Sequence, residues 1–207
     1  MEQLPLHIPA QEPSFETFVA GSNGEALAAV RALAAGTLAE AIVFLWGEPG
    51  SGRSHLLRAA SRQSPQLFVA DDVEALDEAA QQQLFNAINA ARDGRLAVLA
   101  AGSAPPAGLA VREDVRTRLA WGLVYQLKPL SDADKAEHLR AEAARRGLDM
   151  PPEVVAYLLA RLPRDLYSLT SVLDTLDREA LARQRGLTVP LVREVLQSNN
   201  PAKGRGK

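Results

Sequence analysis

The sequence contains no cysteine, and this absence excludes disulfide bonds and thiolate metal sites. Histidine is scarce, with three scattered residues in a chain of 207, so we expect no histidine metal site. No apolar run reaches the roughly 18 residues of a membrane span, and the N-terminus lacks a signal-peptide pattern. These absences predict a cytoplasmic protein with no membrane segment.

An excess of charge of one sign is also missing. The 23 basic and 25 acidic residues give a formal net charge of −2, which argues against a general basic field for DNA or acidic membranes. Aromatic residues make up only 5% of the chain, whereas 47% of it is hydrophobic. The length suits one domain, or one domain with a small appendage, whose helices pack through small residues.

Residues 47–54 read Gly-Glu-Pro-Gly-Ser-Gly-Arg-Ser and lie between an apolar run and a helical pattern. They match the phosphate-binding loop G-x-x-x-x-G-K-[ST] except that Arg53 replaces the lysine. The backbone amides of such a loop point at phosphate, and Arg53 can pair with phosphate as a planar fork. Ser54 is placed to reach Mg²⁺. A plain glycine-rich turn is the alternative, and the arginine weakens the case for normal catalytic competence.

A second apolar stretch, at 67–70, ends in Asp71 and Asp72. In P-loop NTPases the acid after such a strand lies beside the metal, and a further residue orients the attacking water. We therefore expect Asp71 to act with Ser54 at Mg²⁺, and we consider Asp72 a candidate for the acid that orients water. The alternative is an ordinary Asp-Asp turn at the end of a strand.

The order of apolar and helical patterns predicts the fold class. Strand patterns occupy residues 41–46, 67–72, 96–101 and 123–127, and helical patterns occupy 25–35, 53–63, 77–92 and 112–119. Continuous apolar strands that alternate with helices predict an α/β domain with a parallel sheet. Beyond Lys128-Pro129-Leu130 all patterns are helical, at 131–146, 152–161, 163–185 and 188–197. The sequence thus predicts an extended arm at 1–13, an α/β nucleotide-binding domain at 14–128, an all-α four-helix lid at 129–198 and a disordered tail at 199–207.

An α/β nucleotide-binding domain followed by a four-helix lid resembles the AAA+ ATPases. Three motifs resemble the DnaA initiator family: Phe15-x-x-Phe18-Val19-x-Gly21-x-Asn23, Trp46-Gly47-x-x-Gly50-x-Gly52-Arg53-Ser54-His55-Leu56-Leu57 and Arg118-Leu119-x-Trp121-Gly122. Further features resemble one branch of it, the Hda family of DnaA regulatory inactivators: Arg53-Ser54-His55, the arm that begins Gln3-Leu4, and Lys128-Pro129-Leu130-Ser131-Asp132-x-Asp134-Lys135. The resemblance covers nearly the whole chain.

The resemblance implies a negative regulator of chromosomal replication initiation. Such a protein binds ADP, docks on the DNA-loaded β sliding clamp of DNA polymerase III, and stimulates ATP hydrolysis by DnaA. DnaA and the clamp are the implied partners, DNA is reached indirectly through the clamp, and the protein is cytoplasmic and associated with the nucleoid or replisome. Its own ATPase activity is expected to be weak. The expected cofactors are Mg²⁺ and either ADP or ATP, and the sequence does not decide between the two nucleotides. It also does not decide between a monomer and a homodimer.

Two regions gain a role only through the resemblance. Gln3, Leu4, Leu6 and Ile8 become a clamp-binding motif, although the pattern alone favours a disordered tail. Arg118 becomes an arginine finger that acts in trans on the nucleotide of a partner, with Arg112 and Arg116 as the other candidates. Without the resemblance, a solvated surface helix that carries arginines is the better interpretation.

The resemblance also implies a complete nucleotide site. Phe18, Val19 and Asn23 surround the base, and the phosphates contact Gly47, Pro49, Gly50, Ser51, Gly52, Arg53, Ser54 and His55. Arg164, in the first turn of a lid helix, is the expected sensor arginine. Tyr167 is the alternative occupant of the sensor position, and in that case a positive contact to phosphate is missing.

The chain also departs from the AAA+ pattern. Asp71 lies only seventeen positions after Ser54, so the usual second strand and its helix are expected to be absent. The loop after the third strand carries Ser103-Ala104 where a charged or amide sensor is expected. No helix-turn-helix follows the lid, which argues against sequence-specific origin binding. Two alternative functions therefore stay open: an AAA+ ATPase that acts as a loader or remodeller in replication, and a nucleotide-stabilised clamp adaptor.

Overall fold

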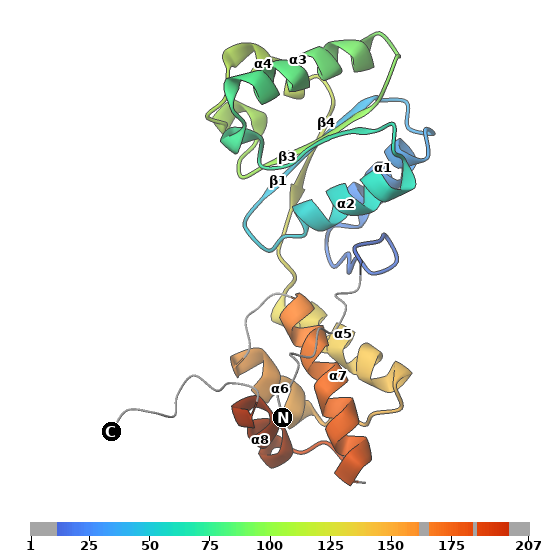
Figure 1. Ribbon diagram of the computed structural model, residues 1–207, viewed down its shortest axis with the longest axis vertical. Coiled ribbons are helices and arrows are strands. Elements are labelled where there is room, and N and C mark those ends of the chain that lie inside the picture. The colour runs from blue at the N-terminus through green and yellow to red at the C-terminus, as the bar shows by residue number, and fades with distance from the viewer. Residues whose placement is uncertain (1–11, 162–165, 184–185, 199–207) are drawn as a thin grey trace, which may run out of the picture. The chain divides into compact units, whose positions relative to one another are not determined.

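The computed structural model describes residues 12–161, 166–183 and 186–198. The chain divides into two compact units, Glu12–Leu130 and the helical part from Ser131 onward (Figure 1). Five expected functional residues lie outside the described residues: Gln3, Leu4, Leu6, Ile8 and Arg164. Tyr167 falls in the first turn of a lid helix. Among the described residues, no helix is both long and apolar enough to span a bilayer.

The first unit is built on a parallel sheet. Its strands are β1 (Ile42–Gly47), β2 (Phe68–Ala70), β3 (Val98–Gly102) and β4 (Leu123–Leu127). The described strands pair in the order β2-β3-β1-β4, and each pairing is parallel. The chain passes from the helix after β1 directly into the edge strand β2, so the shortened sheet that the sequence predicted is confirmed.

Helices cover both faces of this sheet (Figure 1). The helices α1 (Gly24–Ala34) and α2 (Arg53–Gln63) pack on one face, against Val43 and Leu45 of β1. The helices α3 (Glu78–Arg92) and α4 (Glu113–Leu119) pack on the other face, against Ile42 and Phe44. Successive residues of a strand point to opposite faces of the sheet. Because helices cover both faces, every position of β1 must be apolar, which explains its continuous hydrophobic run.

Two short 3₁₀ turns, which the sequence patterns did not predict, complete this unit. They are η1 (Val73–Ala75), after β2, and η2 (Pro106–Gly108), after β3. Each of these two turns follows the carboxyl end of a strand, so both lie near the edge where ligands bind in parallel α/β sheets.

Asp77 caps α3 by accepting a hydrogen bond from the Ala80 backbone N–H at 2.8 Å.

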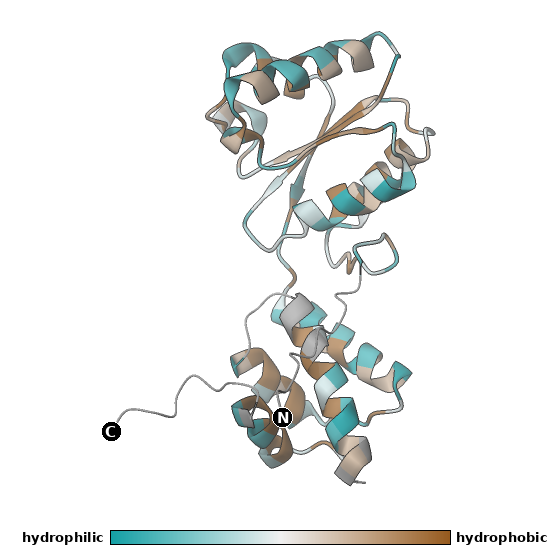
Figure 2. Cartoon of the chain, viewed as in Figure 1, coloured by the Kyte–Doolittle hydropathy of each residue, from teal (hydrophilic) through white to brown (hydrophobic). Residues whose placement is uncertain are grey.

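The second unit contains α5 (Asp132–Arg145), α6 (Pro152–Arg161), α7 (Leu166–Arg183) and α8 (Val189–Ser198). Hydrophilic and hydrophobic residues alternate along its helices (Figure 2). Leu139, Leu158, Leu173 and Val192, one from each helix, are fully buried in a shared core. A network in which Arg146 pairs with Glu142 and Asp174 ties α7 to the end of α5. The predicted α/β core followed by four lid helices is therefore confirmed.

Candidate functional site

The carboxyl ends of all four strands lie along one edge of the sheet because the strands are parallel. The segments that leave this edge begin with residues of the sequence motifs. The phosphate loop follows β1, Asp71 follows β2, Ser103 follows β3 and Lys128 follows β4. This edge is where α/β sheets bind their ligands.

The phosphate loop has the backbone geometry that its glycines permit. Gly50 and Gly52 have φ values of +81° and +97°, a region that side chains with a Cβ rarely adopt. A Cβ on Gly47 would overlap the Leu127 carbonyl oxygen, so the loop leaves β1 in close contact with β4. The loop ends at the N-terminus of α2, whose free N–H groups attract anions.

Two buried polar atoms around this loop lack a hydrogen-bond partner within the part of the chain that the structure describes. They are Ser51 Oγ and Arg53 Nη1. Buried donors of this kind are costly unless they bind a polar group. Together with the loop geometry, they fit the phosphate oxygens of a nucleotide.

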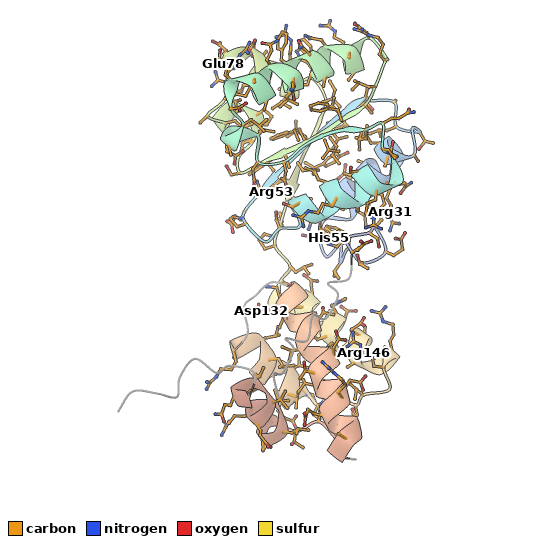
Figure 3. The ribbon with its side chains drawn as sticks, viewed as in Figure 1. Arg31, Arg53, His55, Glu78, Asp132 and Arg146 are labelled. Carbon is orange, nitrogen blue, oxygen red and sulfur yellow. The ribbon has the colours of Figure 1, made fainter. Side chains whose placement is uncertain are left out.

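Arg53 lies between the phosphate loop and the acids that follow β2. Arg53 is labelled in Figure 3. Its Nη2 is 3.4 Å from Asp72 Oδ1, and the Arg53 side chain is only 11% exposed, whereas that of Asp72 is 59% exposed. Asp72 has a φ of +43°, an uncommon conformation for a residue with a Cβ. The structure thus joins two predicted site residues in one ion pair, with Asp72 reaching outward into solvent.

The expected Mg²⁺ donors are a serine hydroxyl and a carboxylate, both of which are ligands that Mg²⁺ accepts. Ser54 is half-buried in the first turn of α2. Asp71 uses Oδ1 to accept the Asp72 backbone N–H at 3.0 Å. No group of three or more acids or histidines gathers as a metal site among the described residues, so Ser54 and Asp71 would hold Mg²⁺ only together with water and bound phosphate.

Phe18 and His55 meet at the start of α2. A Cβ on Gly52 would lie 2.7 Å from Phe18 Cε2, so the phenyl ring rests on the last glycine of the phosphate loop. The rings of Phe18 and His55 have centroids 5.5 Å apart. His55 Nε2 lies 2.8 Å from the Ser14 carbonyl oxygen and 3.2 Å from Thr17 Oγ1. The imidazole therefore links the segment before α1 to the first turn of α2, next to the phosphate loop.

Asn23 is buried, and its side-chain amide forms two hydrogen bonds with the backbone of Lys128. Asn23 Nδ2 donates to the Lys128 carbonyl at 2.8 Å, and the Lys128 N–H donates to Asn23 Oδ1 at the same distance. This pair of bonds brings the start of α1 to the carboxyl end of β4. Val19, which is half-buried, lies in the segment that Asn23 and His55 hold at its two ends.

Arg118 is fixed in position by four neighbours. Its Nε donates to Asn89 Oδ1 at 3.0 Å, and its Nη1 donates to the Asp114 carbonyl at 3.1 Å. Its guanidinium carbon lies 4.3 Å from the centre of the Phe85 ring and 5.0 Å from that of Trp121. Within the described residues, Nη2 has no hydrogen-bond partner. The guanidinium is thus held through Nε and Nη1, and Nη2 remains available as a donor.

The other arginines near α4 are arranged differently. Arg112 forms a two-bond ion pair with Asp114 and also donates to Gln82 Oε1. Arg92 lies over the Trp121 ring at 4.6 Å. Trp121 is 44% exposed, so Arg118 and Arg92 stack on an aromatic ring that solvent can reach.

Glu74 was not predicted from the sequence, although its carboxylate lies among the predicted site residues. Burial acts to raise its pKa, but hydrogen bonds from Ser103 and the charge of Arg53 outweigh this effect and lower the pKa. Glu74 belongs to an unpredicted 3₁₀ turn, and its partner Ser103 is 29 positions away. Asn89 and Phe85, the partners of Arg118, were also missed, because both look like ordinary residues of an amphipathic helix.

Comparison with known proteins gives two results. Residues 132–196 match the family model of the Hda lid domain. The chain as a whole is similar to domain III of the replication initiation protein DnaA from Thermotoga maritima, with 18% identity, 90% of this chain and 96% of that chain covered, and a TM-score of 0.69.

Two further solved structures extend the comparison. The AMPPCP-bound DnaA from Aquifex aeolicus has 18% identity, 84% and 69% coverage of this chain and that chain, and a TM-score of 0.67. The RuvB Holliday junction branch migration motor of Thermotoga maritima has 15% identity, 91% and 72% coverage, and a TM-score of 0.64. At these identities the similarity concerns the fold.

Proposed function

We propose that this chain, an AAA+ protein with a DnaA-like fold and an Hda-type lid, is a negative regulator of replication initiation. It holds ADP, docks on the DNA-loaded sliding clamp, and stimulates ATP hydrolysis by DnaA through Arg118. The match of residues 132–196 to the Hda lid domain carries this proposal. The fold supports the coarser conclusion, an AAA+ protein related to replication initiation.

The phosphate loop and its surroundings support adenine nucleotide binding. In this proposal the side chains of Arg53 and Ser51 and the amides of residues 50 and 52–54 hold the phosphates, because Arg53 Nη1 and Ser51 Oγ are buried without a partner among the described residues and the loop ends at a helix N-terminus. Phe18 and Val19 flank the base, and Asn23 holds their segment in place. Mg²⁺, when bound, would neutralise phosphate charge next to Ser54 and Asp71. Arg164 is proposed as the lid residue that contacts phosphate, and Tyr167 is the alternative at that position.

Arg118 carries the catalytic contribution in this proposal. An arginine that enters the active site of a partner stabilises the charge that develops on the transferred phosphoryl group. Ordering a free arginine costs conformational entropy, which the contacts with Asn89, Asp114, Phe85 and Trp121 reduce in advance. The unpaired Nη2 is the donor that this arrangement makes available to a partner.

In this proposal, the N-terminal arm holds the protein at the DNA-loaded clamp, where the reaction takes place. We propose that Leu6 and Ile8 enter an apolar pocket of the clamp, with Leu4 beside them and Gln3 setting the register. A tether of this kind raises the effective concentration of the protein near clamp-bound DNA without new contacts to DnaA. This role needs no overall basic charge, in agreement with the net charge of −2.

A reconstituted assay of DnaA-ATP hydrolysis with clamp loaded on DNA tests the proposal. We expect wild-type protein to stimulate hydrolysis and Arg118→Ala to lose most of the stimulation, up to about 10³-fold by analogy with trans-acting arginines of GTPase systems. Arg116→Ala tests the neighbouring candidate, because Arg116 lies in the same helix and is half-buried, and we expect this variant to keep the stimulation. Equal stimulation by wild type and Arg118→Ala would contradict the assignment.

One observation keeps an intrinsic ATPase as a second candidate. Asp72 is more than half exposed at the edge of the site, although it also pairs with Arg53. An ATPase that works by itself would show turnover without DnaA, and Asp72→Ala would abolish it. If turnover is absent and nucleotide remains bound, the regulator is favoured.

A further inference from the structure

The ion pair between Arg53 and Asp72 joins two segments of the proposed nucleotide site. Arg53 is the first residue of α2, directly after the phosphate loop, and Asp72 is the second of the two acids that follow β2. Arg53 Nη2 lies 3.4 Å from Asp72 Oδ1. In P-loop NTPases the two segments have different tasks, since the cation of the loop contacts phosphate and a separate residue orients the attacking water. Here the candidates for these two tasks are paired with each other.

The backbone around Asp72 is fixed by local contacts. Its N–H donates to Asp71 Oδ1 at 3.0 Å, and its carbonyl accepts the Ala75 N–H at 2.8 Å. The next residue, Val73, is fully buried. Asp72 itself has a φ of +43°, which a residue with a Cβ seldom adopts. The carboxylate is therefore held near Arg53 by the geometry of the turn as well as by charge.

Arg53 offers two terminal nitrogens, and these have different surroundings. Nη2 faces Asp72, whereas Nη1 is buried and has no hydrogen-bond partner among the described residues. A buried donor of this kind favours an acceptor such as a phosphate oxygen. A planar guanidinium can bind two groups at once through separate nitrogens, whereas a lysine ammonium acts as a compact point charge. Arg53 can thus bind phosphate through Nη1 without releasing Asp72.

We propose that Arg53 is a positioning residue that keeps the Asp72 carboxylate engaged while nucleotide is bound, and thereby suppresses ATP hydrolysis by this chain itself. The inference rests on the proposed nucleotide-binding function of the loop. In hydrolysis a water oxygen bonds to the γ-phosphorus, the bond from that phosphorus to ADP breaks, and the residue that orients the water can take its proton. A carboxylate held against a guanidinium is not free for this task. The chain then retains nucleotide without turning it over.

Arg53→Lys tests the proposal as a gain of activity. Lysine keeps a positive charge for phosphate, but it cannot divide a planar fork between phosphate and Asp72. We expect the intrinsic ATP turnover, measured at saturating ATP without DnaA or clamp, to rise about tenfold above that of the wild type, a modest part of the effect of a positioned acid–base group. Adding Asp72→Asn to Arg53→Lys should remove the gain.

Arg58→Lys is the matched control, because Arg58 lies in the same helix and is exposed. Its turnover should equal that of the wild type. An Arg53→Lys variant that binds ATP without a gain in turnover would overturn the inference, and so would a gain that persists after Asp72→Asn is added.

A double-mutant cycle of Arg53→Gln and Asp72→Asn in urea unfolding without nucleotide provides a second readout. The reference is the same cycle for Arg95 and Asp93, an ion pair at 2.6 Å whose side chains are 68% and 59% exposed. Because the Arg53 side chain is only 11% exposed, water screens its pair less, and we expect the stronger coupling there. Coupling no stronger than that of Arg95 and Asp93 would overturn the inference.

The two readouts distinguish failure of the inference from failure of the proposed function. If the wild type binds fluorescent ADP but Arg53→Lys shows no gain, the inference fails and nucleotide binding stands. If the wild type binds no ADP, the proposed function fails. If only Arg53→Lys loses nucleotide binding, the cycle decides between a coupled pair, which supports the inference, and independent residues, which overturn it.

Discussion

Arg118 and Arg53 have different surroundings, and these surroundings determine which groups each guanidinium can bind. Arg118 makes two hydrogen bonds and two ring contacts, all from α3, α4 and the turn after it. Arg53 is 11% exposed and pairs with an acid at the edge of the sheet. In the proposed function, the first arrangement presents a cation to a partner, and the second keeps a cation inside the phosphate site.

At the residue scale, the glycine of the Arg-Leu-x-Trp-Gly motif has a packing role that can be measured. A Cβ on Gly122 would overlap the Ile42 carbonyl and would lie 2.6 Å from Ile42 Cβ. Because backbone atoms of the central strand cannot easily move aside, we expect Gly122→Ala to lower the free energy of unfolding by about 1–3 kcal/mol.

Gly24→Ala is the control for this prediction, because no atom lies within 4 Å of a Cβ at Gly24 in α1. We expect this change to be neutral or to stabilise the protein by up to about 1 kcal/mol. Urea unfolding of both variants makes the comparison. If Gly122→Ala proves as stable as Gly24→Ala, then the contact between the Trp121-Gly122 turn and β1 is not as close as the structure indicates.

At the scale of elements, the first lid helix begins with a reciprocal cap. Ser131 Oγ accepts the Asp134 N–H at 3.1 Å, and Asp134 Oδ2 accepts the Ser131 N–H at 3.0 Å. Both bonds satisfy amides that the first turn of α5 leaves free. We expect Ser131→Ala to lower the free energy of unfolding by about 1 kcal/mol at neutral pH, as measured by urea unfolding.

The same cap predicts a dependence on pH. The Ser131 hydroxyl and then its backbone N–H, by hydrogen bonding, lower the pKa of Asp134. A lowered pKa in the folded state contributes stability above the unfolded value of about 3.9, and this contribution is lost as the pH falls through the lower, folded value. The stability difference between wild type and Ser131→Ala should therefore shrink in that acidic range. A difference that stays constant down to pH 2 would contradict the prediction.

At the scale of the whole molecule, the proposed function divides the work among separate parts. In this proposal, the first unit holds nucleotide and carries Arg118, and the arm at residues 1–13 binds the clamp. We expect deletion of residues 1–9 to abolish clamp capture in a pull-down assay while fluorescent-ADP binding stays within about twofold of the wild type, because the phosphate loop and its neighbours are all in residues 14–128.

The pull-down also separates the regulator from a plain adaptor. Full-length Arg118→Ala should still capture the clamp, although it fails to stimulate DnaA. If the truncated protein binds the clamp normally, the proposed motif at Gln3, Leu4, Leu6 and Ile8 is wrong. Circular dichroism of the truncated protein checks that the fold is retained.

Local patterns predicted the helices and the strands of this fold. The run at 41–46 was predicted as a buried strand because it is apolar at every position, and β1 is buried on both faces. Gly50 and Gly52 indicated a tight loop, and both have positive φ. The short distance from Ser54 to Asp71 predicted a reduced sheet, since a further strand and helix need more chain than seventeen positions provide. The turns η1 and η2 were not predicted, because single 3₁₀ turns carry no periodic signal.

The sequence by itself determined the α/β order, the four lid helices and the phosphate loop, because periodicity and turn chemistry act between near neighbours in the chain. Only the tertiary structure decided the partners of the site residues. Asn23 binds Lys128 across 105 positions, and Glu74 binds Ser103 across 29. Side chains so far apart in sequence meet only after the parallel strands bring their carboxyl ends to one edge, and no local pattern encodes which atoms then face each other.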